Sequence, residues 1–128
     1  MICLDTNYLV CMLLPQTQEA SRVERWLKQE EKFCTSAVCW YEFLCGPVAE
    51  EKIRIVRDCL EGGIIPFSEA QIAEAARLFN STGRLRRLRM DSMIAACAIT
   101  IRAPLATSNT DDFDVFQHLG LKLFSSEQ

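Results

Sequence analysis

Apolar residues are distributed along the chain in two alternating patterns. Some form short continuous runs, which are typical of buried strands, and others recur at every third or fourth position, which is typical of helices. The short runs predict strands at residues 2–4, 32–35, 64–67, 104–107 and 121–124. Pro66 cannot donate a ladder hydrogen bond, so we expect the third strand at the edge of a sheet or to end there.

The segments between these strands carry the helical spacing. Helices are predicted at residues 7–14, 17–31, 36–46, 48–60, 68–79, 90–101 and 112–119. Thr17 and Ser68 are suited to cap two of them, because a hydroxyl can accept a hydrogen bond from the free backbone N–H groups of a first helical turn. The segment 90–101 is apolar almost all round and should therefore be buried.

Strands that alternate with helices indicate one fold class. Right-handed crossovers between successive strands give a mainly parallel sheet with helices on both faces. We therefore expect an α/β protein built as a three-layer α/β/α sandwich, with residues 1–128 forming one domain. The length of 128 residues and the mass of 14.6 kDa leave little room for a second domain.

Composition and cysteine usage exclude several classes of protein. With 49% hydrophobic and 24% charged residues, the chain has the make-up of a soluble globular protein, and no apolar run is long enough to cross a membrane. The first residues show no secretory signal. The seven cysteines have no C-x-x-C spacing, and the single histidine, His118, cannot complete a zinc site with them. We therefore expect a cytoplasmic protein with reduced thiols.

Four acidic residues stand at positions where chemistry is expected in such a fold. Ligands of open parallel sheets bind beyond the carboxyl ends of the strands. Asp5 follows the first strand, Asp112 follows the fourth, and Asp91 opens the most apolar helix. Each of these three could instead simply cap a helix. Glu42 is different, because it lies within an apolar helical segment, where a carboxylate is seldom buried without a partner.

If the four carboxylates converge, their chemistry follows from their charge. Neighbouring carboxylates repel and raise one another's pKa unless a cation supplies positive charge. Carboxylate oxygens are preferred ligands of Mg²⁺ and Mn²⁺, and these ions commonly engage substrate phosphate as well. The pattern therefore points to metal-assisted hydrolysis of a phosphodiester, in which the metal activates a water and stabilises the leaving oxygen.

The acids lie in four motifs, which are ICLDTN at 2–7, WYEFLCG at 40–46, DSMIAA at 91–96 and ATSNTDDF at 106–113. In this order and spacing they resemble the motifs of PIN-domain ribonucleases, most closely the small VapC-like toxins of type II toxin–antitoxin pairs. The resemblance covers residues 2 to about 124. It implies an endoribonuclease that depends on Mg²⁺ or Mn²⁺, cuts RNA, forms a homodimer and is blocked by a cognate antitoxin protein.

The same resemblance implies roles for individual residues. The catalytic and metal-binding acids would be Asp5, Glu42, Asp91 and Asp112. Thr6 and Thr107 fall where family members place a hydroxyl near the metals, and both are candidates for substrate binding. Asn109 occupies a position that is Asn in many members and Asp in others, so its role as polar support or as ligand stays open.

An arginine cluster directly precedes Asp91. Its members Arg86, Arg87 and Arg89 could bind RNA phosphates beside the metal site, because guanidinium groups pair well with phosphate oxygens. A solvated helix start or an antitoxin-facing surface are the alternatives. The formal charge of −3 gives no global basic field. The alternative function is a non-catalytic PIN-like module for RNA binding or dimerisation, although the presence of all four acids favours the nuclease.

Overall fold

The fold is built around a four-stranded parallel sheet. The computed structural model describes residues 1–124. The strands stand in the order β3-β2-β1-β4 and comprise β1 (Ile2–Leu4), β2 (Phe33–Ser36), β3 (Ile64–Ile65) and β4 (Leu105–Ala106). Cys3 of β1 pairs with Cys34 on one side and Leu105 on the other. The chain therefore leaves the central strand β1 in a region flanked by the carboxyl ends of β2 and β4.

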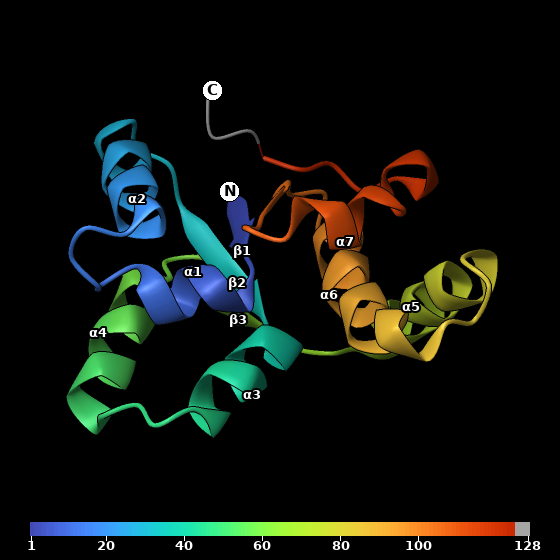
Figure 1. Ribbon diagram of the computed structural model, residues 1–128, viewed down its shortest axis with the longest axis horizontal. Helices are drawn as coiled ribbons and strands as arrows, with labels where there is room; N and C mark the ends of the chain where they lie inside the picture. Colours follow the sequence, from blue (N-terminus) through green and yellow to red (C-terminus); the bar gives the residue numbers. More distant parts are fainter. Residues whose placement is uncertain (125–128) are drawn as a thin grey trace.

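Helices cover both faces of this sheet. They are α1 (Thr6–Cys11), α2 (Gln18–Lys28), α3 (Ala37–Cys45), α4 (Glu50–Cys59), α5 (Glu69–Ser81), α6 (Arg89–Thr100) and α7 (Thr110–Asp114). Helices α1, α2 and α4 lie on one side of the strands, and α5, α6 and α7 lie on the other (Figure 1). This confirms the predicted three-layer α/β/α sandwich with a parallel sheet, and β3 takes the edge position expected from Pro66.

Helix starts follow local sequence chemistry. The side chain of Thr17 accepts a hydrogen bond from the backbone N–H of Ala20, and Ser68 accepts one from Gln71, so both predicted caps are confirmed. Ser36 caps α3 in the same way. These caps satisfy N–H groups that have no partner within a helix.

Helix α6 is the buried helix of the fold, as its apolar sequence predicts. The fully enclosed positions include Ala95, Ala96, Cys97 and Ala98, and their small side chains let the helix backbone approach its neighbours closely. Its main packing partner is α5. On the other face of the sheet the core is aromatic, with Trp26 stacked 5.6 Å from Tyr8 between ring centroids. None of the helices within residues 1–124 is long and apolar enough to cross a membrane.

The predictions for the end of the chain need correction. Residues 121–124 form only one parallel bridge, between Leu123 and Leu105, and not a regular strand. The predicted helix 112–119 divides into α7 and a single 3-10 turn, Gln117–Leu119. Strand β4 has only two residues, which leaves little backbone for a further partner, and Gly120 turns the chain with a φ of 118°.

Several helix boundaries also differ from prediction. Helix α2 ends at Lys28, since Glu30 takes a φ of 64° that a right-handed helix cannot contain. Helix α1 starts at Thr6 and ends at Cys11, short of Leu14.

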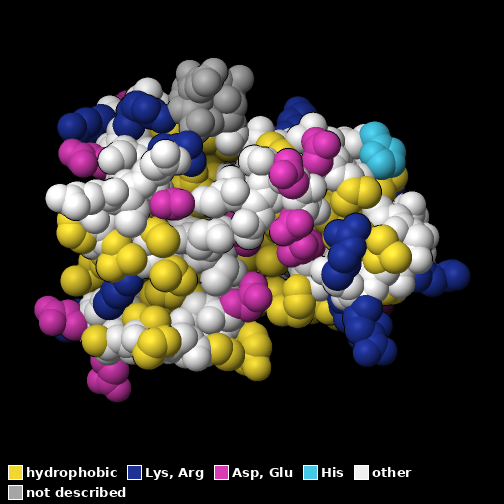
Figure 2. Space-filling view, viewed as in Figure 1, with side chains coloured by type: hydrophobic (Ala, Val, Ile, Leu, Met, Phe, Trp, Pro, Cys, Tyr) yellow, Lys and Arg dark blue, Asp and Glu magenta, His cyan; other side chains and the backbone are white. Residues whose placement is uncertain are grey.

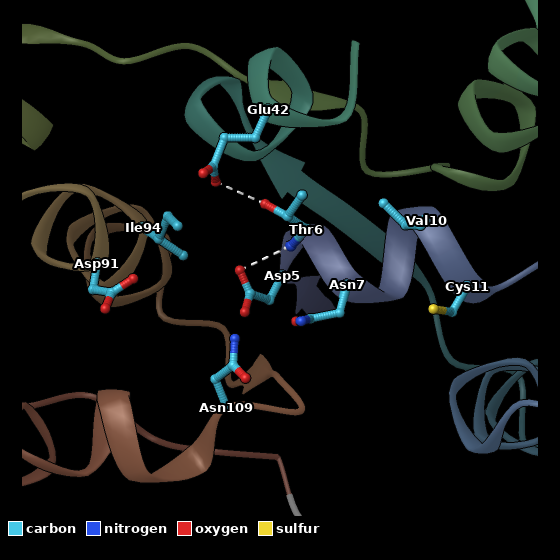
Figure 3. A pocket seen from close by; sticks show the side chains of 9 residues that line it. All are labelled: Asp5, Thr6, Asn7, Val10, Cys11, Glu42, Asp91, Ile94 and Asn109. Carbon is cyan, nitrogen blue, oxygen red and sulfur yellow. Dashed lines mark hydrogen bonds between the residues drawn. The ribbon is translucent and has the colours of Figure 1, made fainter. Parts of the chain in front are cut away.

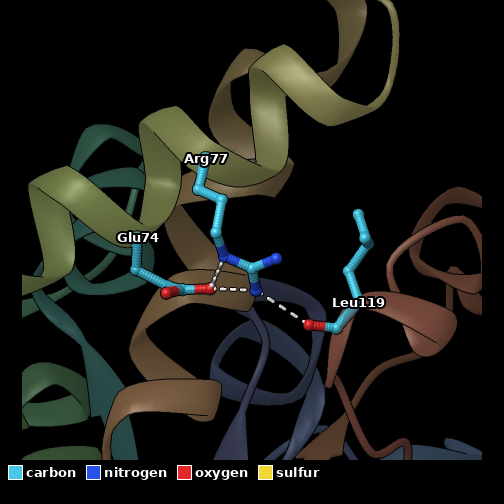
Figure 4. Close-up of polar contacts among 3 residues, drawn as sticks. All are labelled: Glu74, Arg77 and Leu119. Atoms are coloured by element: carbon cyan, nitrogen blue, oxygen red, sulfur yellow. Dashed lines mark hydrogen bonds and ion pairs between the residues drawn. The ribbon is translucent and has the colours of Figure 1, made fainter.

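A polar contact fixes the turn after α7 to α5 (Figure 4). The Nη2 of Arg77 donates to the carbonyl oxygen of Leu119 at 2.8 Å, and its Nε donates to Oε1 of Glu74 at 2.9 Å. Glu74 thereby orients a guanidinium that satisfies the carbonyl at the end of the 3-10 turn Gln117–Leu119. This contact secures the segment that follows the acids of α7.

Candidate functional site

Asp5 is placed by the central strand and held by three donors. It follows β1 and is the N-cap of α1, and only 4% of its surface is exposed. Its Oδ1 accepts from the backbone N–H of Thr6 at 2.8 Å and from Sγ of Cys39 at 3.6 Å. Its Oδ2 accepts from Oγ1 of Thr107 at 2.7 Å. The side chain therefore serves as a helix cap and as part of a buried polar site at once.

Glu42 reaches the same region from helix α3. Its Oε1 accepts a hydrogen bond of 2.8 Å from Oγ1 of Thr6, which is the first residue of α1. Cys39 lies one helical turn earlier on α3 and faces Asp5. Two contacts from one face of α3 thus connect it to the start of α1, which explains how Glu42 is tolerated in so apolar a helix.

Asp91 and Asp112 each lie in the first turn of a helix, α6 and α7. The pKa of Asp91 is raised from 3.8 to about 6, chiefly by burial and then by the negative charges of Asp112, Asp5 and Glu42. Arg87 opposes this rise. Asp91 is therefore near enough to feel the charges of the other three predicted acids, although these come from the end of β1, the middle of α3 and the first turn of α7.

Burial also raises the pKa of Asp5, with a smaller contribution from the charge of Asp112. The hydrogen bonds donated by Thr107, Thr6 and Cys39 act in the opposite direction, because they stabilise the ionised carboxylate.

Three of the predicted acids, Asp5, Glu42 and Asp91, border one open cavity of about 410 Å³ (Figure 3). Its lining residues are Asp5, Thr6, Asn7, Val10, Cys11, Glu42, Asp91, Ile94 and Asn109. Asp112 does not line this cavity but acts on it through its charge. Thr107 stands behind Asp5, and its hydroxyl also accepts a 3.0 Å hydrogen bond from the backbone N–H of Asn109.

Five residues of this region are not among those predicted from the sequence. Four of them line the cavity, namely Asn7, Val10, Cys11 and Ile94, and Cys39 contacts Asp5. Asn7 belongs to the quoted motif at 2–7, so its position two residues after Asp5 was an available signal. Cys39 could not be found in this way, because its contact depends on how α3 packs against α1.

The donor set fits a hard divalent cation in its chemistry. Within residues 1–124 no three His, Cys, Asp or Glu side chains form a ready-made metal cluster. The cavity nevertheless offers three carboxylates, of which Asp5 and Glu42 help to raise the pKa of Asp91, together with an amide oxygen, Oδ1 of Asn7, that has no hydrogen-bond partner. Oxygen donors with uncompensated negative charge are the set that Mg²⁺ and Mn²⁺ prefer.

The three predicted arginines do not converge on this cavity. Arg87 is near enough to lower the pKa of Asp91, and Arg86 is exposed in a short 3-10 turn. Arg89 instead lies over the ring of Phe79, 5.6 Å from its centroid, and lines a separate, mostly apolar cavity between α5 and α6. Figure 2 shows acidic side chains gathered near the centre of this face, with Lys and Arg side chains beside them.

Fold and site together define an α/β/α protein with an acidic cavity at the carboxyl edge of a parallel sheet. The family model of the PIN domain matches residues 2–119, and the chain belongs to this family. PIN domains are generally nucleases, and they generally use divalent metals. The resemblance inferred from the four motifs is thereby confirmed.

Several solved structures share the fold. FitAcB from Neisseria gonorrhoeae is 25% identical, with a TM-score of 0.73, and the match covers 100% of this chain and 99% of that one. VapBC2 from Rickettsia felis, bound to a DNA fragment from its promoter, is 24% identical over 97% and 98% of the two chains, with a TM-score of 0.72. VapBC-1 from nontypeable Haemophilus influenzae is 17% identical over the full length of both chains, with a TM-score of 0.73. A search of curated proteins found no match.

Proposed function

We propose that this protein is a divalent-metal-dependent endoribonuclease that uses Mg²⁺ or Mn²⁺. The observation that carries the proposal is the gathering of negative charge around Asp91, whose pKa is raised to about 6 chiefly by burial and then by the charges of Asp112, Asp5 and Glu42 at the edge of one cavity. Such a concentration of negative charge is costly in an isolated protein and becomes favourable when a cation binds.

In this proposal the four acids hold the metal. A bound Mg²⁺ or Mn²⁺ would supply a water of lowered pKa and neutralise charge on the phosphate and the leaving oxygen. Thr107 and the backbone of Thr6 keep both oxygens of Asp5 in one orientation through hydrogen bonds of 2.7 and 2.8 Å. The hydroxyl of Thr6 orients Glu42 in the same way. Preorganised carboxylates need no rearrangement when the metal and substrate enter.

Substrate binding is assigned to the residues around these acids. Arg87, which acts on Asp91 through its charge, would bind a phosphate close to the cleaved bond. Arg86 is exposed beside it and would bind a neighbouring phosphate, and Arg89 would contact RNA only beyond the cavity. Asn109 lines the cavity opposite α1 and would contact the nucleotide.

We further infer that the protein is the toxin of a toxin–antitoxin pair. The similar solved structures from Neisseria gonorrhoeae and Rickettsia felis are complexes named for two partners, and the match covers nearly all of each chain. An antitoxin protein would then cover the acidic cavity. We also propose a homodimer, supported by exposed apolar side chains such as Tyr41, Leu44 and Ile72 on α3 and α5. The unpaired cysteines suit the cytoplasm.

The nuclease proposal is tested by incubating the purified protein with RNA and either Mg²⁺ or Mn²⁺. We expect cleavage that EDTA abolishes, and a loss of at least about 100-fold in Asp5→Asn, since one metal ligand is removed. Asp58→Asn, an exposed carboxylate on α4, is the matched control and should cleave like the parent. RNA binding without cleavage under any metal condition would refute the proposal and favour the non-catalytic module.

The toxin proposal has its own test. Expression of the protein alone should arrest bacterial growth, whereas Asp5→Asn should not. Co-expression with the product of an adjacent small gene should restore growth and yield a stable complex by size-exclusion chromatography. Active RNA cleavage without any growth arrest would favour a stand-alone nuclease.

A further inference from the structure

Asn7 has an unmet hydrogen-bonding requirement inside the acidic cavity. Its Oδ1 is enclosed and has no hydrogen-bond partner. Within residues 1–124 the only other enclosed side-chain atoms in this condition are Nε1 of Trp26 and Oε1 of Gln71, and neither residue lines the cavity. Polar atoms enclosed in a folded protein are nearly always paired, so an exception requires an explanation.

The polar side chains beside Asn7 already form hydrogen bonds with other residues. Both oxygens of Asp5 accept hydrogen bonds, and the hydroxyl of Thr6 donates to Glu42. The amide of Asn7 points toward the space between Asp5 and Asn109, as Figure 3 shows. A half-turn about its last side-chain torsion exchanges its oxygen and nitrogen without changing its shape, and it turns Oδ1 from its enclosed position toward the cavity, where a ligand can reach it.

The chemistry of the free atom restricts what it can bind. Oδ1 is an acceptor only, so it cannot form a hydrogen bond with the oxygens of a phosphodiester, which are acceptors too. Unless a metal ion contacts it, this oxygen requires a hydrogen-bond donor that arrives with the ligand. In RNA the O–H donor nearest to any phosphodiester is the ribose 2′-hydroxyl, which is also the group that distinguishes RNA from DNA.

We propose that the side-chain amide of Asn7 accepts a hydrogen bond from the 2′-hydroxyl of a ribose next to the cleaved phosphodiester, and so selects RNA over DNA. The inference rests on the proposed ribonuclease function. Asn7 lies two residues from Asp5 in the first turn of α1, so a phosphate held at Asp5 brings its attached sugars within reach of the amide.

The experiment pairs a change in the protein with a change in one substrate atom. A short RNA with one cleavage site is compared with versions that carry a 2′-deoxy or 2′-fluoro nucleotide on either side of it, since fluorine accepts but does not donate. Single-turnover cleavage rates are measured for the parent, for Asn7→Leu, which keeps the shape of asparagine, and for Asn80→Leu, an exposed control on α5. Binding of Mn²⁺ alone is measured for each variant by electron paramagnetic resonance.

We expect one 2′-deoxy position to slow the parent and the control roughly tenfold, the effect of one lost hydrogen bond. Asn7→Leu should be slowed by a similar factor on the all-ribose substrate and should be insensitive to that position. Unchanged sensitivity in Asn7→Leu would overturn the inference, as would equal cleavage of the deoxy substrate by the parent.

Weakened Mn²⁺ binding by Asn7→Leu with unchanged 2′-deoxy sensitivity would also overturn the inference, and would assign the amide to the metal site. If the parent cleaves no RNA, the ribonuclease proposal itself fails, and that result differs from all of these. Should Asn7→Leu not fold, Asn7→Ala is measured in the same way, with circular dichroism to establish that it is folded.

Discussion

Replacing Asp91 with asparagine should make the metal-free protein more stable at neutral and alkaline pH. The pKa of this carboxyl is raised from 3.8 to about 6 by burial and by Asp112, Asp5 and Glu42. The folded state therefore holds the proton more tightly than the unfolded chain does. The ionised carboxylate weakens folding progressively as the pH rises from about 4 to about 6, and this effect is complete at higher pH.

The size of the effect follows from the shift. A difference of about 2 units, at about 1.4 kcal/mol each, corresponds to about 3 kcal/mol if the group were fully enclosed. Asp91 is only half-buried, and solvent screening reduces the figure to about 1–2 kcal/mol. Asp91→Asn removes the charge while it keeps the shape, so its gain in stability should be of this order above pH 7 and should vanish near pH 4.

The assay is urea denaturation of the parent, Asp91→Asn and the control Asp58→Asn at several pH values between 4 and 8, in the presence of EDTA. The free energy of unfolding of Asp91→Asn should exceed that of the parent only at the higher pH values. Adding Mn²⁺ should reverse the order, because the ion binds the folded parent more tightly than the variant. If Asp91→Asn had a higher free energy of unfolding than the parent at every pH, or if Asp58→Asn showed the same increase, the electrostatic reasoning would be refuted.

Three further predictions concern the support of the site and the fold. Thr107→Val should reduce the rate of RNA cleavage about 10-fold or more, because it loses the 2.7 Å hydrogen bond to Asp5. Thr107→Ser should retain most activity. Equal cleavage rates for Thr107→Val and the parent would contradict this role. Trp26→Ala should lower the free energy of unfolding by about 3–5 kcal/mol, since Trp26 is fully buried. A loss below about 1 kcal/mol, measured by urea denaturation, would be inconsistent with that packing. Thr17→Ala should cost about 0.5–2 kcal/mol through loss of the α2 cap, and an unchanged urea midpoint would count against the cap.

The architecture was predictable from the sequence because its signals are local. Helical spacing, capping hydroxyls such as Ser68 and the breaking effect of Pro66 act within a few residues, and each was confirmed. The failure at 121–124 has a different origin. Whether a short apolar segment becomes a strand depends on the free backbone of a partner far away in the chain, and β4 offers only two residues.

The candidate site, too, was predictable from the sequence only in part. Residue type and order predicted that Asp5, Asp91 and Asp112 would be associated, because acids after parallel strands and at helix starts share one edge of the sheet, and Glu42 was added because a carboxylate in an apolar helix needs a partner. Which neighbours the arginine side chains would face could not be predicted from the sequence. Arg87 and Arg89 are two residues apart, yet one acts on Asp91 and the other stacks on Phe79, since side chains two positions apart near a helix start face different neighbours.

The order of helices and strands and the acidic character of the site follow from residue types and their spacing. Three features follow from the packing of distant segments and not from any local pattern: Cys39 donates to Asp5, Thr107 bridges Asp5 and Asn109, and the amide oxygen of Asn7 has no partner. Hydrogen bonding between distant segments depends on distances of a few tenths of an ångström, which the packing of helices on the sheet sets and no local pattern records.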